Sequence, residues 1–204
     1  MRIDVLDKGF VELVDSMGSD ETIAASARLS YLGQYRSEDS DSLLISQLIN
    51  KGHTSPLEQV ELRFLVKAPI YIARQWMRHR TWSYSEVSRR YTAKNMDFYT
   101  PSFEKEGMKE LYNGSVSTSL RAYQELIGAG IRKEQARGVL PTCMYTTFYA
   151  KTDLNNLFHF LELRLEKGAQ YEITEYSNAI CKLIEPIIPM TFEIWKDKMN
   201  RKDN

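Results

Sequence analysis

Residues 60–79 read VELRFLVKAPIYIARQWMRH, and this stretch decides the fold because its pattern changes half-way. Apolar residues at 60, 62, 64 and 66 alternate with polar ones, which predicts a strand with one buried face. Pro69 suits the start of a helix, which we expect over residues 70–79. On that helix Arg78 follows Arg74 by four residues and Gln75 by three, so all three can line one face.

The rest of the chain reads mainly as helix. Ser55, Pro56 and Glu58 form a compact helix-start signal just before the predicted strand. Antiparallel strands separated by helical runs, without regular strand–helix alternation, predict an α+β fold with an antiparallel sheet and a large helical portion. We treat residues 1–204 as a single domain. We expect helices over 20–31, 39–50, 119–129, 132–138, 153–165, 170–185 and 190–199, strands over 2–6 and 144–150, and a surface loop or insertion over 101–119.

The segment 74–90 is strongly basic inside a neutral chain. It holds five arginines and one acid, Glu86, a local charge of +4 (five minus one), whereas the whole sequence has 27 basic and 27 acidic residues. Arginine grips phosphate or carboxylate with two hydrogen bonds, so the segment predicts a phosphorylated ligand. A solvated helix face and a nucleic-acid patch are the alternatives. The pI of 6.8 and the aromatic residues between the arginines favour a partly buried cleft.

Several chemistries are disfavoured by what the sequence lacks. There is no GxGxxG or GxxxxGK[ST] for nucleotide phosphates and no CxxC or HExxH for zinc. Cys143 has a neutral local sequence, so a cysteine nucleophile is not expected, and we assign His159 a structural role. No apolar run is long enough to span a bilayer, and no signal-peptide core opens the chain. These features predict a cytoplasmic protein with no bound metal and no membrane partner.

A family resemblance follows from the basic segment. Arg78-His79-Arg80, seven residues and then Ser88-Arg89-Arg90 resemble the signature of the flavin-dependent thymidylate synthases. Further segments resemble the family in order and spacing, so the likeness covers essentially the whole chain. These segments are MRIDVLDKGFVELVD at the N-terminus, GHTSPLEQ at 52–59, KAPIYIARQW at 67–76, LP at 140–141, FLELR at 160–164 and GAQYEI at 168–173.

The resemblance implies reductive methylation of dUMP to dTMP, with FAD as cofactor and methylenetetrahydrofolate and NADPH as cosubstrates. It also implies a homotetramer whose active sites draw on several subunits, and no nucleic-acid partner. The catalytic residues would be Arg78, Glu86, Ser88 and Arg90, with Ser88 beside the nucleotide rather than acting as a nucleophile. FAD would contact His53, Ser55, Arg78, His79, Arg80, Glu86, Glu162, Leu163, Arg164 and Gly168. The nucleotide would contact Gln75, Arg78, Glu86, Val87, Ser88, Arg89, Arg90, Thr147 and Thr174.

Within that resemblance, Glu86 has two candidate roles. As the one acid among the arginines it should stay ionised, and it would either pair with an arginine or orient dUMP and water.

The chain departs from the family pattern at four positions. Many members have asparagine at 85 and glycine at 89, where this chain has Ser85 and Arg89. Many also have arginine at the positions of Thr147 and Thr174, and threonine supplies no positive charge. We hypothesise that Arg89 takes over part of the phosphate contact.

The same departures allow a C5-alkylating relative that acts on UMP or dCMP. A non-enzymatic nucleic-acid-binding protein is the alternative from a different class, and it would bind no flavin.

Overall fold

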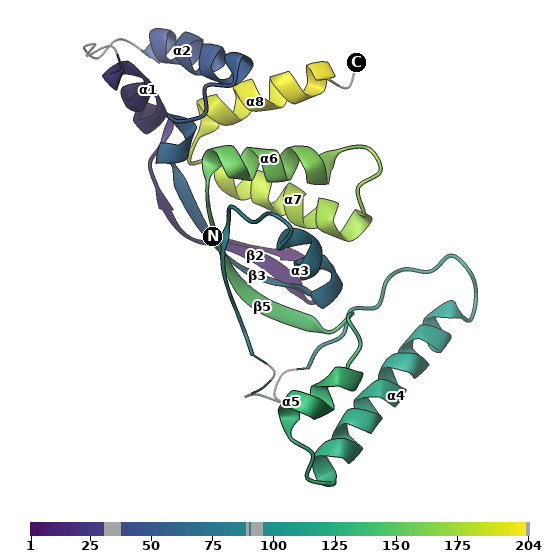
Figure 1. The fold of residues 1–204 in the computed structure, drawn as a ribbon. Coiled ribbons are helices and arrows are strands. Elements are labelled where there is room, and N and C mark those ends of the chain that lie inside the picture. The colour runs from purple at the N-terminus through teal and green to yellow at the C-terminus, as the bar shows by residue number, and fades with distance from the viewer. Residues whose placement is uncertain (31–37, 89, 91–95, 203–204) are drawn as a thin grey trace.

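The computed structural model describes residues 1–30, 38–88, 90 and 96–202 (Figure 1). Five strands form one sheet, and helices account for most of the remaining chain. The strands are β1 (Arg2–Val5), β2 (Gly9–Met17), β3 (Glu61–Pro69), β4 (Ser83–Glu86) and β5 (Tyr145–Asp153). The helices are α1 (Asp20–Leu29), α2 (Glu38–Lys51), α3 (Ile70–Trp76), α4 (Met108–Gly128), α5 (Lys133–Ala136), α6 (Leu154–Leu165), α7 (Tyr171–Ile184) and α8 (Pro189–Lys202), with 3₁₀ turns η1 (Leu57–Gln59) and η2 (Arg137–Val139).

The sheet is antiparallel throughout, with strand order β1-β2-β3-β5-β4, and this confirms the predicted α+β class. Strands β3 and β5 pair over nine residues, from Glu61 opposite Asp153 to Pro69 opposite Tyr145. One face of the sheet is apolar and meets helices α3, α6 and α7 (Figure 1). The second face carries Lys67 and Thr147, which stand opposite each other in register, and Tyr149 there is 45% exposed.

Trp76, the last residue of α3, is the centre of the core. Its side chain is fully buried, and its ring centroid lies 4.9 Å from that of Phe160 and 5.6 Å from that of Phe148. Rings of Trp82 and Tyr176 meet it edge-on at 6.0 and 6.1 Å. Trp76 therefore joins α3 to strand β5, helices α6 and α7 and the segment before β4.

Helix α3 ends three residues earlier than its sequence predicts. The hydroxyl of Tyr84 lies 3.0 Å from the Trp76 carbonyl oxygen and 3.1 Å from that of His79. The last carbonyls of a helix need partners from outside it, and this phenol supplies one. The signal at residues 55–58 likewise forms only the turn η1, whose N-cap is Pro56 without a side-chain cap.

Residues 108–119, predicted as part of a surface loop, belong instead to helix α4. Only Tyr123 of its 21 residues is buried, so the helix has little of the apolar periodicity by which helices are detected. Helices α4 and α5 extend from the end of the sheet opposite to α1, α2 and α8 (Figure 1). Strands β2 and β4 were missed, because a register shift between Leu13 and Asp15 breaks the alternation of β2 and β4 is a mostly exposed edge strand.

Asp153 begins α6 as the sequence predicts, and its contribution can be measured. Its carboxylate accepts a hydrogen bond from the Asn156 amide at 2.9 Å. Replacing Asp153 with alanine should lower the free energy of unfolding by about 1 kcal/mol, because a helix N-terminal amide loses its partner. Asp153→Asn keeps a capping side chain and should cost clearly less in a urea titration. Equal losses in both variants would contradict the capping role.

Candidate active site

The arginines of the RHR segment are exposed and available for an anion. Arg78 and Arg80 follow helix α3, and Arg74 lies on it. Within the described part of the chain, none of these three guanidinium groups forms an ion pair. Unpaired arginines on one short segment leave a positive surface that suits phosphate groups.

His79 differs from its arginine neighbours because it is buried, with 9% of its surface exposed. Its Nε2 lies 3.2 Å from Nη2 of Arg164 on α6. Burial first, and then the charges of Arg164 and His159, lower the pKa of His79 to about 4. The imidazole is therefore neutral at pH 7, and because the guanidinium can only donate, Nε2 accepts and the ring proton sits on Nδ1.

The depressed pKa of His79 predicts that acid destabilises the fold. The unfolded chain protonates this residue near its ordinary pKa of 6.5, whereas the folded chain does so only near pH 4. The stabilisation is therefore complete above pH 6.5 and is lost as the pH falls from 6.5 to 4. Urea titrations at several pH values should show a steeper decline for the wild type than for His79→Gln. Parallel profiles would contradict the assignment.

Arg164 connects helix α6 to the end of helix α3. Besides facing His79, its Nη2 donates to the main-chain oxygen of Gln75 at 3.1 Å. Its Nε is buried and has no hydrogen-bond partner among the described residues. The side chain of Gln75 is also held, because its Nε2 donates to Oε1 of Gln170 at 2.5 Å. The structure thus brings together three predicted site residues, Gln75, His79 and Arg164.

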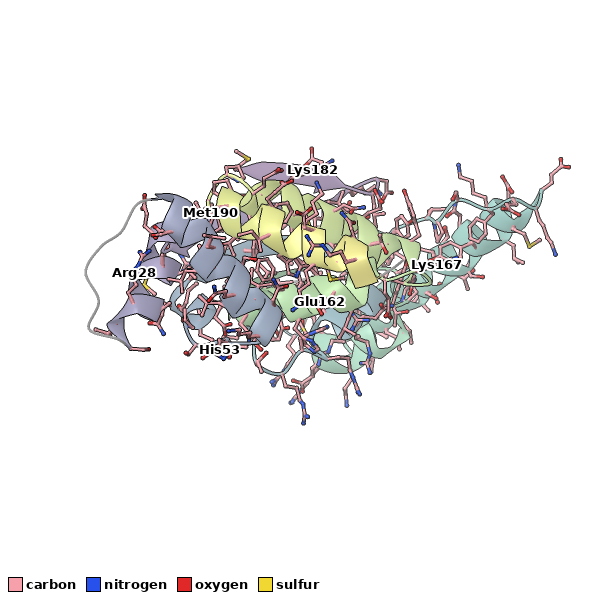
Figure 2. All side chains as sticks on the ribbon, turned by 90° about the horizontal axis from the view of Figure 1, so that it is seen from above. Arg28, His53, Glu162, Lys167, Lys182 and Met190 are labelled. Carbon is pink, nitrogen blue, oxygen red and sulfur yellow. The ribbon has the colours of Figure 1, made fainter. Side chains whose placement is uncertain are left out.

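A cavity of about 220 Å³ with both apolar and polar lining residues lies beside this group, between η1, α2, α6 and α8. His53, from the turn after α2, and Glu162, from α6, both line it (Figure 2). Ser55 lines a neighbouring cavity of about 350 Å³ together with His53. Two segments that were predicted to contact the same cofactor, 53–55 and 162–164, therefore meet at adjoining cavities.

His159, for which we predicted a structural role, lies beside these predicted site residues. It is exposed, lines the cavity with His53 and Glu162, and its ring centroid lies 6.0 Å from that of His79. The available signal was spacing, since His159 precedes Glu162 by three residues and so shares its helix face. Of the other predicted cofactor residues, Leu163 is 37% exposed on α6, and Gly168 follows that helix with φ +102°, which favours glycine.

The end of β4 carries the second half of the signature. Oε1 of Glu86 accepts a hydrogen bond from the Thr146 hydroxyl at 2.5 Å, and within the described ranges Glu86 forms no ion pair with an arginine. The amide of Val87 continues the ladder to the Thr147 oxygen at 2.9 Å. Ser88 accepts from the main-chain amide of Arg90 at 3.3 Å.

Of the two arginines that end the signature, the structure describes Arg90 but not Arg89. Nη2 of Arg90 lies 3.3 Å from Oε2 of Glu134 on α5, and both side chains are about half exposed. An exposed pair of this kind contributes little to stability, so losing the contact with Glu134 would cost Arg90 little. Arg89, to which we assigned part of the phosphate contact, lies outside the described residues.

Thr147 and Thr174, the two threonines at family arginine positions, lie far apart in the architecture. The Thr147 side chain is on the second face of the sheet, opposite Lys67. Thr174 is on helix α7, beyond the other face, and its hydroxyl donates to the main-chain oxygen of Arg164 at 3.1 Å. The sheet therefore separates Thr147 from Gln75, Arg164 and Thr174 within one protomer.

Two features are absent from the described residues, a metal-binding cluster and a membrane-spanning helix. No cluster of three or more histidine, cysteine, aspartate or glutamate residues there could hold a metal ion. None of the helices in that part of the chain combines the length and the apolar character that a membrane crossing needs.

Unpaired arginines and a neutral buried histidine lie near adjoining cavities on this α+β scaffold, an arrangement that suits phosphorylated ligands. Residues 12–190 match the family described as thymidylate synthase complementing protein, and the chain belongs to the flavin-dependent thymidylate synthase family. A flavin-dependent thymidylate synthase of Thermus thermophilus is 42% identical over 215 residues, which cover 98% of this chain and 80% of that protein. The enzyme of the same name from Thermotoga neapolitana is 42% identical over 201 residues, covering 95% and 93%.

A solved structure supports the same fold. The UMP/dUMP methylase PolB from Streptomyces cacaoi, bound with 5-Br dUMP, superposes with a TM-score of 0.86 at 30% identity, over 96% of this chain and 97% of PolB. The same methylase has also been solved with 5-Br UMP and superposes with a TM-score of 0.82.

Proposed function

We propose that this protein methylates dUMP reductively to dTMP, taking the one-carbon unit from methylenetetrahydrofolate and reducing equivalents from NADPH through FAD. The family membership over nearly the whole chain carries this proposal. The three unpaired arginines of the 74–80 segment support it, because FAD brings a pyrophosphate and dUMP a phosphate to the site. Residues 1–204 would act as one cytoplasmic domain, without a nucleic-acid or membrane partner.

The chemistry of the donors at the site fits FAD. Arg164 has a buried Nε with no partner in the described part of the chain, and such a donor suits an acceptor on a bound ligand. When bound, the flavin supplies the hydride transfer, while the protein supplies orientation and charge. The residues that we propose to hold it are His53, Ser55, Arg78, His79, Arg80, Glu86, Glu162, Leu163, Arg164 and Gly168, with His159 added from the cavity lining.

The nucleotide would lie against Gln75 and Arg78 and the 86–90 segment. Arg78, Glu86, Ser88 and Arg90 would bind and orient dUMP at the reacting end. Thr147 and Thr174 complete the set, and they supply hydroxyl groups where many relatives supply charge.

The residues proposed to contact the nucleotide lie on both sides of the sheet, which supports active sites formed by more than one subunit. Thr147 points to the second face, whereas Gln75 and Thr174 belong to elements on the helical side. One protomer cannot surround a single nucleotide with all of them, but a second copy seated on the second face could complete the set. We therefore propose a homotetramer with composite active sites, and light scattering of the FAD-loaded protein would measure its mass.

Release of tritium from dUMP labelled at carbon five tests the activity directly. We expect release only when FAD, NADPH and methylenetetrahydrofolate are all present. Purified protein that retains FAD but releases no tritium would overturn dUMP as the substrate. Protein that binds no flavin, yet binds DNA or RNA with strong salt dependence, would return the nucleic-acid alternative.

A second candidate function is methylation of UMP in addition to dUMP. The observation that favours it is the likeness to PolB, a UMP/dUMP methylase solved with both 5-bromo nucleotides. The threonines at 147 and 174 are further reason to test it. Tritium release from UMP labelled at carbon five separates the two functions, since a strict dUMP enzyme releases none from UMP.

A further inference from the structure

A chain of hydrogen bonds runs from a buried carboxylate to Gln75. Glu172, on helix α7, is 8% exposed. Its Oε1 lies 3.1 Å from the Tyr71 hydroxyl and its Oε2 lies 2.9 Å from Nε2 of Gln170. Oε1 of Gln170 then meets Nε2 of Gln75 at 2.5 Å. Four side chains from α3 and the start of α7 thus form one chain.

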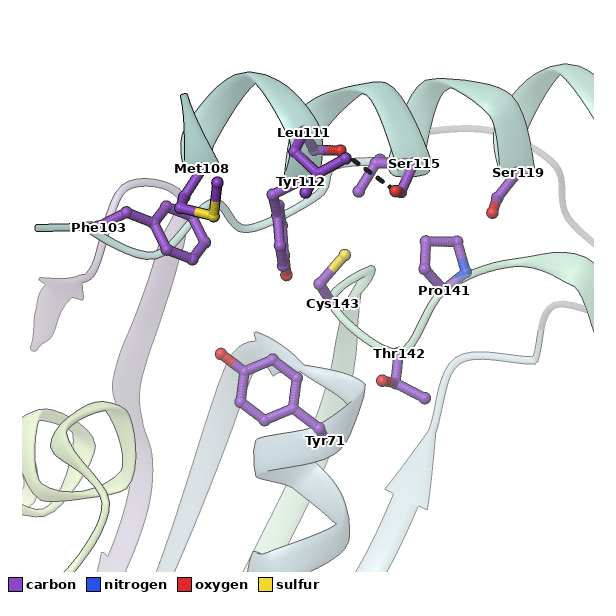
Figure 3. A pocket seen from close by; sticks show the side chains of 11 residues that line it. Tyr71, Phe103, Met108, Leu111, Tyr112, Ser115, Ser119, Pro141, Thr142 and Cys143 are labelled. Atoms are coloured by element: carbon purple, nitrogen blue, oxygen red, sulfur yellow. Dashed lines mark hydrogen bonds between the residues drawn. The ribbon is translucent and has the colours of Figure 1, made fainter. Parts of the chain in front are cut away.

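The carboxylate fixes the direction of every bond in this chain, because it can only accept. Tyr71 rises from α3 into an apolar cavity of about 460 Å³ (Figure 3), where burial, and next the charge of Glu172, raise its pKa above the ordinary value. The phenol therefore stays protonated and donates. Tyr99 lies against the same carboxylate, and burial followed by the charge of Glu172 raises its pKa to about 12.

The carboxylate also fixes the orientation of the Gln170 and Gln75 side-chain amides. Since Glu172 accepts, Gln170 must turn its NH₂ group toward Glu172 and its oxygen toward Gln75. Gln75 must in turn donate with its NH₂ group, which leaves its own carbonyl oxygen Oε1 facing away from the chain. Without the carboxylate, either amide could rotate by 180° and exchange oxygen for nitrogen.

The main chain on both sides of these amides is also held. The Thr174 hydroxyl lies 3.2 Å from the Gln170 carbonyl oxygen and the Thr174 amide donates to that oxygen at 3.1 Å. Arg164 donates to the Gln75 carbonyl oxygen at 3.1 Å. Thr174, which replaces a family arginine, therefore takes part in holding Gln170 in place.

We propose that Glu172, acting through Gln170, orients the Gln75 amide so that its carbonyl oxygen accepts the N3–H of a uracil ring. This inference rests on the proposed function and adds a base-selecting role to it. Uracil carries a hydrogen on N3, whereas the N3 of cytosine is an acceptor. An oriented Gln75 oxygen would meet cytosine acceptor to acceptor, and a site that leaves polar groups unpaired in this way rejects the wrong ligand. Gln170 and Glu172 are positioning residues in this scheme.

The test compares the dissociation constants of dUMP and dCMP, measured by calorimetry on the FAD-loaded protein. Gln170 is exposed, so the fold should tolerate Gln170→Ala, with a small fall in melting temperature because Glu172 loses one donor. We expect it to reduce the preference for dUMP over dCMP on the order of tenfold. Glu172→Gln should reduce it similarly, because a carboxamide can also donate. Gln124→Ala, an exposed glutamine on α4, is the matched control and should leave the preference unchanged.

The double variant Gln75→Ala/Gln170→Ala shows whether Gln170 acts through Gln75. We expect the same preference as in Gln75→Ala alone, since the residue being positioned is gone. If the wild type binds dUMP, two results would overturn the base-selecting role. One is an unchanged preference for dUMP over dCMP in Gln170→Ala, and the other is an equal loss of affinity for both nucleotides. A wild type that binds neither nucleotide would overturn the proposed function itself.

Discussion

Replacing Trp76 with alanine is expected to lower the free energy of unfolding by about 3–5 kcal/mol, the usual cost of removing a large aromatic side chain from a core. The ring is fully buried and contacts Phe148, Phe160, Trp82 and Tyr176. Four elements that meet at this ring would lose contacts together, so the cavity could collapse only in part. A urea titration followed by circular dichroism measures the loss.

Trp76→Phe is the control that separates packing from hydrogen bonding. The Trp76 indole Nε1 is buried without a partner in the described part of the chain, so phenylalanine removes no hydrogen bond there. It keeps part of the ring contacts and leaves a smaller cavity than alanine does, so the loss should be clearly smaller than for Trp76→Ala. Similar losses for alanine and phenylalanine would contradict a role based on packing. A phenylalanine variant that is more stable than the wild type would show that the unpaired nitrogen is costly.

The sequence predicted those parts of the fold that have a regular apolar pattern. Strand β3 buries every second residue and helix α6 buries one face, and both elements were predicted from these patterns. Helix α4 buries only Tyr123 and was half missed, because a mostly exposed helix needs no apolar stripe. Strand β4 is short and lies at a sheet edge, where its hydrogen bonds to β5 determine its conformation more than its side chains do.

The residues of the candidate site also differ in how far the sequence could predict them. The RHR segment could be recognised because its arginines are contiguous in sequence. The groups that hold it come from distant segments, since Arg164 is 85 residues from His79 and Gln170 is 95 residues from Gln75. Such pairs follow from how α6 and α7 pack on the sheet, and no local pattern contains that information. Glu172 was missed for this reason, although a buried carboxylate requires partners.

Arg164→Met is expected to weaken FAD binding on the order of 10- to 150-fold. Methionine fills similar space but loses the donor to the Gln75 oxygen and to Nε2 of His79, and a hydrogen bond from a charged group contributes about 1.5–3 kcal/mol. The free Nε that we assign to the cofactor is lost as well. Titration of the apoprotein with FAD, followed by flavin fluorescence, measures the change. The exposed residue Arg121 on α4 supplies the control. This helix packs on α5 and η2, so Arg121→Met removes a guanidinium outside the proposed FAD contacts and should leave FAD affinity unchanged.

The same variant also has an effect that does not depend on FAD. The positive charge of Arg164 is the second cause, after burial, of the low pKa of His79, so the pKa should rise in Arg164→Met toward 6.5. Arg164→Lys keeps the charge but not the planar fork, and it should hold the pKa down while still losing FAD affinity. NMR titration of His79 in both variants distinguishes the two contributions. A pKa that stays near 4 in Arg164→Met would mean that burial alone keeps His79 neutral, and the electrostatic link between α6 and the RHR segment would have to be abandoned.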